Sequence, residues 1–238
     1  MPVELTVVVP VYNEAALVEG AVTQWLDLLD RLRIDYAFVL YDDGSTDSTA
    51  DILARLAARH PRVAIRRQSN RGHGPTILRG YREAAGAWVF QTDSDGEMDT
   101  AAFEALWRSR ADYDLLVGRR VDRQAPLARR LITAVSRHSV RVAFGPGLHD
   151  VNSPYRLVRA ARLRDVLPLI PDDTFAPNVL LSGLAVRHGW RVHERPVRCA
   201  ARRTASGSLG GTRALRAAVR ALAQTLRAAW RGPRPRGA

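Results

Sequence analysis

The chain has 238 residues, of which 46% are hydrophobic, enough for one α/β domain with a full core and too few for two ordinary enzymes. Its one cysteine, Cys199, excludes an internal disulfide, and no apolar stretch reaches the ~18–20 residues of a membrane span. The 36 Lys and Arg residues exceed the 24 Asp and Glu residues, giving a net charge of +12. This excess indicates polyanionic partners, namely nucleic acid, anionic lipid or phosphorylated substrates, although the codon bias of a GC-rich genome explains it equally well.

Strand-like and helical segments alternate through the first half of the chain. The β-branched runs predict strands at 5–11, 36–42, 63–67, 87–93 and 114–120, and apolar residues at helical spacing predict helices at 14–33, 47–59, 75–85 and 100–108. This alternation predicts an α/β fold with a mostly parallel central sheet and helices on both faces. Ligands of such sheets bind beyond the carboxyl ends of the strands, so the residues that follow each strand are the candidates for chemistry. Because a strand is expected from residue 5, we expect no signal peptide. The single cysteine fits a reducing compartment.

After residue 120 the alternation breaks down. The pattern there predicts a helix at 126–144, a strand at 150–158, a helix at 174–188 and a strand at 190–198. A Gly/Ser-rich loop at 206–211 then leads into a last helix and a Pro/Arg-rich tail. We therefore expect a single domain over residues 1–211, followed by a basic helix and tail over 212–238.

Two polar clusters follow the first two predicted strands. The first is PVYNE at 10–14, in which Asn13 is readily explained as the N-cap of the next helix. The second is DDGSTDST at 42–49, in which a turn and a cap explain all but the adjacent carboxylates of Asp42 and Asp43. One of those two carboxylates is well placed to accept hydrogen bonds from a base or a ribose.

A third cluster, TDSDGE at 92–97, follows the apolar strand AWVF. Its carboxylates, Asp93, Asp95 and Glu97, alternate with small residues, so they can converge in an extended turn. Magnesium and manganese prefer carboxylate oxygens and are commonly bound by one or two carboxylates together with substrate phosphates. The cluster therefore predicts a Mg²⁺ or Mn²⁺ site, and an acidic surface loop is the alternative.

A fourth set is basic. Any one of these arginines is more often a solvated surface residue than a ligand, but guanidinium groups at strand ends are what a diphosphate requires. The set comprises Arg119 and Arg120, Arg129 and Arg130, Arg156, and Arg202 and Arg203.

The order of these motifs resembles glycosyltransferase family 2. The resemblance rests on VVVPVYNE, DDGSTD, the Gly-containing loop RGHGPTILRG at 71–80, and TDSDGE. The second half resembles the polyprenyl-phosphate mannosyl- and glucosyltransferases of that family, through VGRR at 117–120, HDVNSPYRLVR at 149–159 and RRTASGSLGG at 202–211. Together these motifs cover about residues 5–211.

The resemblance implies a single Rossmann-like GT-A domain that takes a sugar from a UDP- or GDP-sugar with inversion, using Mg²⁺ or Mn²⁺. Pro10, Tyr12 and Glu14 match positions that hold the nucleoside, and Asp42 and Asp43 match the pair that contacts base and ribose. Asp93, Ser94 and Asp95 match the metal and diphosphate motif, with Glu97 where relatives often carry Gln. Arg119, Arg130 and Arg203 fall at or near positions that bind diphosphate or acceptor phosphate, and Asp150 lies in the acceptor-side motif.

The chain also departs from that pattern, which leaves the acceptor open between polyprenyl phosphate and a soluble hydroxyl compound. His73, Arg79 and Asn178 replace the residues that relatives commonly carry, and the last loop lacks the Ser-Lys pair of the mannose synthases. A hydroxyl acceptor needs a general base, for which Asp150 is the first candidate. A phosphate acceptor needs only cations, and Asp150 would then orient arginines.

The segment 213–231 carries an apolar stripe beside a stripe of arginines when drawn as a helix. Such a helix is typical of a membrane interface, and a helix packed on the domain with its arginines in water is the alternative. With a lipid acceptor, we expect a cytoplasmic protein that is peripheral at the inner face of the cell membrane.

Two other functions compete with this reading. The charge alone would suit a nucleic-acid-binding protein, but acidic clusters lie where binding would occur and no recognition motif appears. A nucleotidyltransferase also uses carboxylate-bound metal on an α/β sheet, but the chain lacks a Gly-rich triphosphate loop with a lysine.

Overall fold

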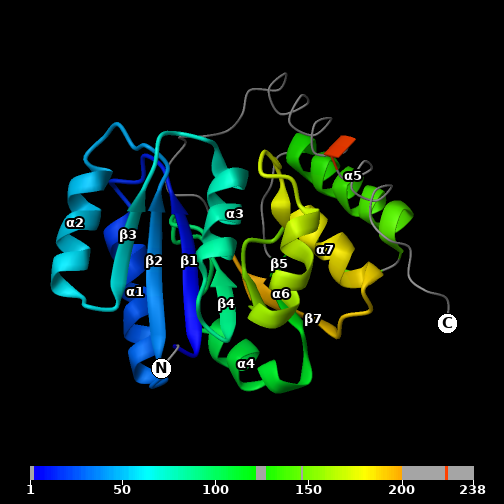
Figure 1. Ribbon diagram of the computed structural model, residues 1–238, viewed down its shortest axis with the longest axis horizontal. Helices are drawn as coiled ribbons and strands as arrows, with labels where there is room; N and C mark the ends of the chain where they lie inside the picture. Colours follow the sequence, from blue (N-terminus) through cyan, green and yellow to red (C-terminus); the bar gives the residue numbers. More distant parts are fainter. Residues whose placement is uncertain (1–2, 122–126, 146, 200–222, 225–238) are drawn as a thin grey trace.

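The computed structural model describes residues 3–121, 127–145, 147–199 and 223–224 (Figure 1). Within them, seven strands form one sheet in the order β3-β2-β1-β4-β6-β5-β7. The strands are β1 (Leu5–Val11), β2 (Tyr36–Asp42), β3 (Val63–Arg67), β4 (Trp88–Gln91), β5 (Leu115–Val121), β6 (Arg156–Arg159) and β7 (Val192–Arg198).

The strand directions place most carboxyl ends of the strands at one edge of this sheet. β1 pairs in parallel with β2 and β4, β2 with β3, and β5 with β7, whereas β6 runs antiparallel to both β4 and β5. The mostly parallel α/β sheet is therefore confirmed. Six carboxyl ends and the start of β6 share the edge at which ligands of such sheets bind.

Helices cover both faces of the sheet, and the core divides accordingly into two clusters. One face is packed by α1 (Val18–Arg31), α2 (Thr49–Arg59) and α4 (Ala102–Arg108). The other is packed by α3 (His73–Glu83), α5 (Leu127–Phe144), α6 (Ala160–Val166) and α7 (Pro177–Arg187), of which α3, α6 and α7 lie in front of the sheet in Figure 1. Two short 3₁₀ turns, η1 (Arg110–Asp112) and η2 (Leu167–Leu169), complete the described elements.

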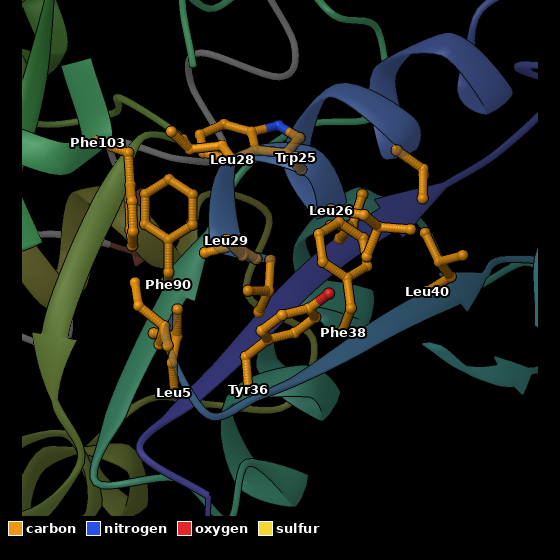
Figure 2. Packing of buried hydrophobic residues seen from close by; sticks show 14 of the residues in the cluster. Leu5, Trp25, Leu26, Leu28, Leu29, Tyr36, Phe38, Leu40, Phe90 and Phe103 are labelled. Atoms are coloured by element: carbon orange, nitrogen blue, oxygen red, sulfur yellow. The ribbon is translucent and has the colours of Figure 1, made fainter. Parts of the chain in front are cut away.

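Aromatic rings fill the core beneath α1 and α4. The Phe90 ring lies 4.7 Å from that of Phe103, 5.1 Å from that of Trp25 and 5.0 Å from that of Tyr155, measured between centroids (Figure 2 shows the first three). Rings at these separations in tilted or edge-to-face arrangements stabilise one another beyond the area that they bury. Since Phe90 belongs to β4, this packing fixes the strand that ends just before Asp93.

Two predictions about the elements are wrong. The strand predicted at 150–158 begins only at Arg156, because the Ser153 N–H turns back to the Asp150 carbonyl and Pro154 has no N–H to offer a neighbouring strand. Asn13 does not cap α1, which begins at Val18 after Leu17. Apart from the last predicted helix, the other predicted helices and strands are confirmed, with boundaries shifted by up to four residues at α1 and by less elsewhere.

The predicted last helix falls almost wholly outside the described residues, as do the loop at 206–211 and the boundary at 211. Ala223 and Gln224 are described and helical, and the Gln224 side chain accepts from the Phe175 N–H at 2.9 Å and donates to the Asp173 carbonyl at 3.2 Å. In the part of the chain that the structure describes, no helix combines the length and the apolar character needed to cross a membrane.

Candidate active site

A cleft of about 490 Å³ opens at the carboxyl edge of β1, β2 and β4. This volume lies in the range of pockets that bind small ligands and cofactors. Its lining comes from four chain segments far apart in sequence: Pro10, Val11, Tyr12, Asn13 and Glu14; Asp43; Asn70, Gly72, His73 and Thr76; and Asp93, Ser94 and Asp95. The structure thus brings together seven of the predicted site residues: Pro10, Tyr12, Glu14, Asp43, Asp93, Ser94 and Asp95.

The loop after β1 is held to the loop after β2 by Asn13. Its backbone is left-handed, with φ of 53°, a conformation that Asn tolerates better than most residues. The Asn13 N–H donates to the Ser45 hydroxyl at 3.0 Å, and its side-chain oxygen accepts from the Thr46 N–H at 2.8 Å. The neighbouring Tyr12 is 45% exposed on the cleft wall, so its ring is available to stack on a flat group.

Asp43 and Asp42 occupy different environments. Asp43 lies in the cleft, and its carboxylate accepts from the N–H groups of Arg71 and Gly72, at 2.9 Å each, and from the Gln68 amide at 2.7 Å. These bonds fix the loop that enters α3. Asp42 is fully buried away from the cleft, where it accepts from the Ser45 N–H and from the Arg67 guanidinium at 3.1 Å.

Asp93 and Asp95 lie beyond the end of β4, on the other side of the cleft. Asp93 is flanked by the His73 imidazole, at 3.8 Å, and by the side-chain amide of Gln91, which donates to it at 3.3 Å. Asp95 accepts from the Glu97 N–H at 3.0 Å, which closes a tight turn. Glu97 does not line the cleft, and no group of three or more His, Cys, Asp or Glu side chains in the described ranges is arranged to hold a metal ion. The described residues thus place Asp93 and Asp95, but not Glu97, in the cleft lining, and a metal site that uses all three carboxylates stays a prediction.

Next to the cleft, Asp150 and Arg120 form a two-pronged ion pair. The guanidinium donates from Nε and from Nη2, at 2.8 Å each, to the two carboxylate oxygens, and the Arg120 N–H adds a third bond at 3.2 Å. Burial acts to raise the pKa of Asp150, but Arg120 outweighs it, and the pKa lies below its usual value. Asp150 is therefore ionised, and each of its carboxylate oxygens accepts at least one hydrogen bond from Arg120.

Glu194 on β7 holds the backbone of the loop that carries Asp150. Its carboxylate accepts from the backbone N–H groups of His149, at 2.8 Å, and Asp150, at 2.9 Å.

Burial acts to lower the pKa of Arg120, but the charges of Asp150 and, further away, Asp93 raise it overall. Arg120 thus lies within the electrostatic field of both the acceptor-side motif and the Asp93 carboxylate.

Arg119 is the predicted site residue of β5, whereas the residue that contacts Asp150 is its neighbour Arg120. Arg119 is exposed, because successive strand residues point to opposite faces. The alternation of side chains along a strand indicates that Arg119 and Arg120 point to opposite faces of the sheet. It does not indicate which of the two residues faces the acceptor-side loop. Arg130 lies on α5 with its side chain outside the described part, and Arg203 lies outside the described residues altogether.

Behind Asp93 lies a buried polar group that the motifs did not predict: Gln91, Tyr81 and Asn178. Two sequence signals pointed to it: Gln91, a polar residue at the end of the apolar strand that precedes TDSDGE, and Asn178, which departs from the family pattern. The cleft itself presents four carboxylates, from Glu14, Asp43, Asp93 and Asp95, which would repel an anionic ligand unless a cation intervened.

Comparison with known proteins gives one family match and several similar relatives. Residues 6–164 match the family described as Glycosyl transferase family 2. Among curated proteins, the undecaprenyl-phosphate 4-deoxy-4-formamido-L-arabinose transferase of Pseudomonas aeruginosa is 29% identical over 203 residues, which cover 81% of this chain and 60% of the relative. The protein of the same name from Photorhabdus laumondii is 27% identical over 178 residues, covering 73% of this chain and 54% of the relative. The chain thus spans less than two thirds of the length of these relatives.

Solved structures share the fold at low sequence identity. Mannosyl-3-phosphoglycerate synthase from Rubrobacter xylanophilus superposes with a TM-score of 0.70 at 16% identity, covering 99% of this chain and 77% of that one. Glucosyl-3-phosphoglycerate synthase from Mycobacterium tuberculosis, solved with Mn²⁺, UDP-glucose and phosphoglyceric acid, gives 0.68 at 15% identity, covering 97% and 81%. These likenesses, with the topology described above, confirm the GT-A fold.

Proposed function

Because the chain belongs to glycosyl transferase family 2, we propose that it is an inverting, metal-dependent transferase that moves a sugar from a UDP- or GDP-sugar to polyprenyl phosphate. The nucleoside diphosphate would occupy the cleft between Tyr12, Asp43 and Asp93. The acceptor would approach from the side of Asp150 and Arg120. The curated relatives named for undecaprenyl phosphate support this class of acceptor.

The observation that carries the proposal is the engagement of Asp150 by Arg120. A hydroxyl acceptor must lose a proton, and a general base needs an available lone pair and a pKa near the working pH. Asp150 is held on both oxygens by Arg120 and has a lowered pKa, which makes it a weak base. A phosphate acceptor is already anionic, and it needs a cation that is held in a fixed direction, which Asp150 provides by orienting Arg120.

The oxygen atoms that line the cleft are suitable ligands for a divalent cation. Asp93 and Asp95 offer carboxylate oxygens at one end, and Mg²⁺ and Mn²⁺ commonly complete such a site with substrate phosphates. When bound, the ion would neutralise charge that develops on the departing diphosphate. The mannosyltransferase of Pyrobaculum calidifontis, solved with GDP-Man and Mn²⁺, has the same fold with a TM-score of 0.61 at 19% identity.

The remaining cleft residues would bind and orient the donor. The Tyr12 ring offers a face for the base, and Asp43 holds the backbone that approaches α3. With a lipid acceptor, the protein would work at the cytoplasmic face of a membrane as a peripheral protein.

Transfer assays test the proposal. The purified protein, with Mn²⁺ present, is first screened against UDP- and GDP-sugars by thermal shift. The stabilising donor is then offered with polyprenyl phosphate and, separately, with soluble hydroxyl acceptors. We expect a lipid-linked product of inverted anomeric configuration that is lost in excess EDTA. Transfer to hydroxyl acceptors alone would contradict the choice of acceptor, and retention of salt-dependent RNA binding without any donor binding would contradict the enzyme.

A further inference from the structure

Three buried polar side chains behind Asp93 form hydrogen bonds with one another. Gln91, the last residue of β4, has no exposed surface, and Tyr81 on α3 and Asn178 on α7 are almost as deeply buried. The Asn178 amide donates to Gln91 Oε1 at 2.8 Å. The Tyr81 hydroxyl lies 3.3 Å from Gln91 Oε1 and 2.9 Å from Asn178 Oδ1.

The chemistry of these groups fixes the direction of every bond. An ionised carboxylate only accepts hydrogen bonds, so the end of the Gln91 amide that faces Asp93 must be its NH₂ group. Gln91 Oε1 then faces inward, where it accepts from Asn178 Nδ2, and Asn178 Oδ1 is left to accept from the Tyr81 hydroxyl. Burial raises the pKa of Tyr81 far above the working range, so the phenol remains a donor.

Arg156 anchors this group to the acceptor-side loop. Its guanidinium is fully buried and donates to the carbonyls of Asn178, at 3.1 Å, Val151, at 3.2 Å, and Ser153, at 2.9 Å. Buried, fully satisfied polar groups have few alternative arrangements, because any rotation leaves a donor or an acceptor unpaired. The Gln91 side chain therefore has one arrangement available, and that arrangement points a donor at Asp93.

We propose that Gln91 is a positioning residue for Asp93, and that Tyr81 and Asn178 hold its amide in the orientation that directs this carboxylate toward the cation of the donor complex. The inference rests on the proposed function, since it assigns Asp93 to that cation. Side chains behind a metal-binding carboxylate commonly change metal affinity by about 10- to 100-fold when they are replaced.

The test is the affinity of the full-length protein for Mn²⁺ in the presence of UDP or GDP, measured by the electron paramagnetic resonance signal of free Mn²⁺. Gln91→Met keeps the length of the side chain and removes the donor, so the dissociation constant should rise by about 10- to 100-fold. Tyr81→Phe removes only the phenol that orients the amides, and a smaller rise of about 2- to 10-fold is expected.

Thr6→Val is the matched control. Thr6 is buried on β1 far from the cleft, where its hydroxyl accepts from the Gly86 N–H at 2.9 Å, so the variant loses a buried hydrogen bond of the same kind. It should lower the melting temperature and leave Mn²⁺ affinity unchanged. This separates positioning from a general loss of stability.

The outcomes are distinguishable. Mn²⁺ binding that Asp95→Ala abolishes, and that is equal in the wild type and in Gln91→Met, would overturn this inference and leave the proposed function standing. Absence of Asp95-dependent Mn²⁺ binding in the wild type would overturn the metal-dependent function and this inference together. If Gln91→Met does not fold, unchanged affinity in folded Tyr81→Phe overturns the inference.

Discussion

The guanidinium of Arg120 donates a hydrogen bond to each carboxylate oxygen of Asp150, at 2.8 Å each, where the end of β5 contacts the loop before β6. This pair favours the proposed role of Asp150 as a support for a cation over the role of a catalytic base. Because the Asp150 N–H is in turn held by Glu194, the direction of Arg120 is set by two strands, β5 and β7.

The first prediction separates the two roles of Asp150. If Asp150 orients Arg120, then Asp150→Asn and Arg120→Lys should both raise the KM for the phosphate acceptor by about 10- to 100-fold, the effect of losing a hydrogen bond between charged groups. The pH dependence of kcat should stay as in the wild type. Arg59→Lys, an exposed arginine on α2 that pairs with Glu19, is the control. Loss of the acidic limb, the fall of kcat toward low pH, from the pH profile of Asp150→Asn would instead identify it as the base.

The second prediction concerns the metal. Asp95→Ala should reduce turnover by at least about 100-fold with the melting temperature nearly unchanged, since Asp95 is half-exposed at the cleft and supports only its own turn. Steady-state rates across a Mn²⁺ titration check this, with excess EDTA on the wild type as the parallel measurement. Full activity in EDTA would remove the metal from the mechanism.

The third prediction separates Asp43 from Asp42. Asp43→Ala frees the N–H groups of Arg71 and Gly72 at the cleft, so nucleoside diphosphate affinity should fall by at least ~1 kcal/mol in calorimetry. Asp42→Ala should act mainly on stability, because its partners are Ser45 and Arg67 outside the cleft. An equal loss of affinity in both variants would mean that the two carboxylates act as one unit.

The fourth prediction concerns stability at acid pH. Asp114 is buried among Arg159, Arg162 and Arg191 at 3.5–3.6 Å. Burial acts to raise its pKa, but hydrogen bonds from Arg191 and the neighbouring charges lower it overall. A lowered pKa means that this stabilisation is fully present above the unfolded value near 4 and is lost as the pH falls through the folded value.

Asp114→Asn should therefore cost about 1–2 kcal/mol at pH 7, modest because the arginines are partly solvated, and the cost should disappear toward pH 2. Denaturant unfolding of both proteins across pH 2–7 measures it. A difference in the free energy of unfolding that stays constant over this range would show that Asp114 stabilises the fold through packing and not through its charge.

The fold could be predicted largely from the sequence because each segment carried its own periodicity. Apolar runs such as LTVVVPV and the helical spacing of Trp25 with Leu28 depend only on neighbouring residues. The segment 150–155 could not be predicted in this way. Its conformation depends on Glu194 and Gly118, which accept from the Asp150 N–H and the Ser153 hydroxyl, respectively, and which are distant in sequence.

The site was predictable where motifs follow strand ends and unpredictable where partners come from elsewhere. Tyr12, Asp43 and Asp95 line the cleft because parallel strands end at one edge. The engagement of Asp150 and the amide behind Asp93 depend on which face of β5 and β4 turns inward. Periodicity gives the alternation of the faces, and only the packing of β6 and α7 gives the direction.

The last prediction concerns the C-terminal segment and the membrane. When 213–231 is drawn as a helix, Leu215, Val219, Leu222, Leu226 and Trp230 form one stripe, beside a stripe of arginines. Each arginine near anionic headgroups contributes about 1 kcal/mol, so the intact protein should sediment with anionic liposomes at low salt and much less at high salt. Deleting 213–238 should abolish this sedimentation and spare donor binding, although it also removes the contact between Gln224 and Phe175.

Gln224→Ala in the full-length chain is the matched control for that contact, because it removes the hydrogen bonds to Asp173 and Phe175 and keeps every arginine. It should sediment like the wild type. If Gln224→Ala also fails to sediment with the liposomes, membrane binding depends on the contacts of Gln224 with Asp173 and Phe175 and not on the charge of the segment alone. If the wild type itself ignores anionic vesicles at low salt, the helix is not a membrane anchor, and a lipid acceptor would have to be reached by another surface.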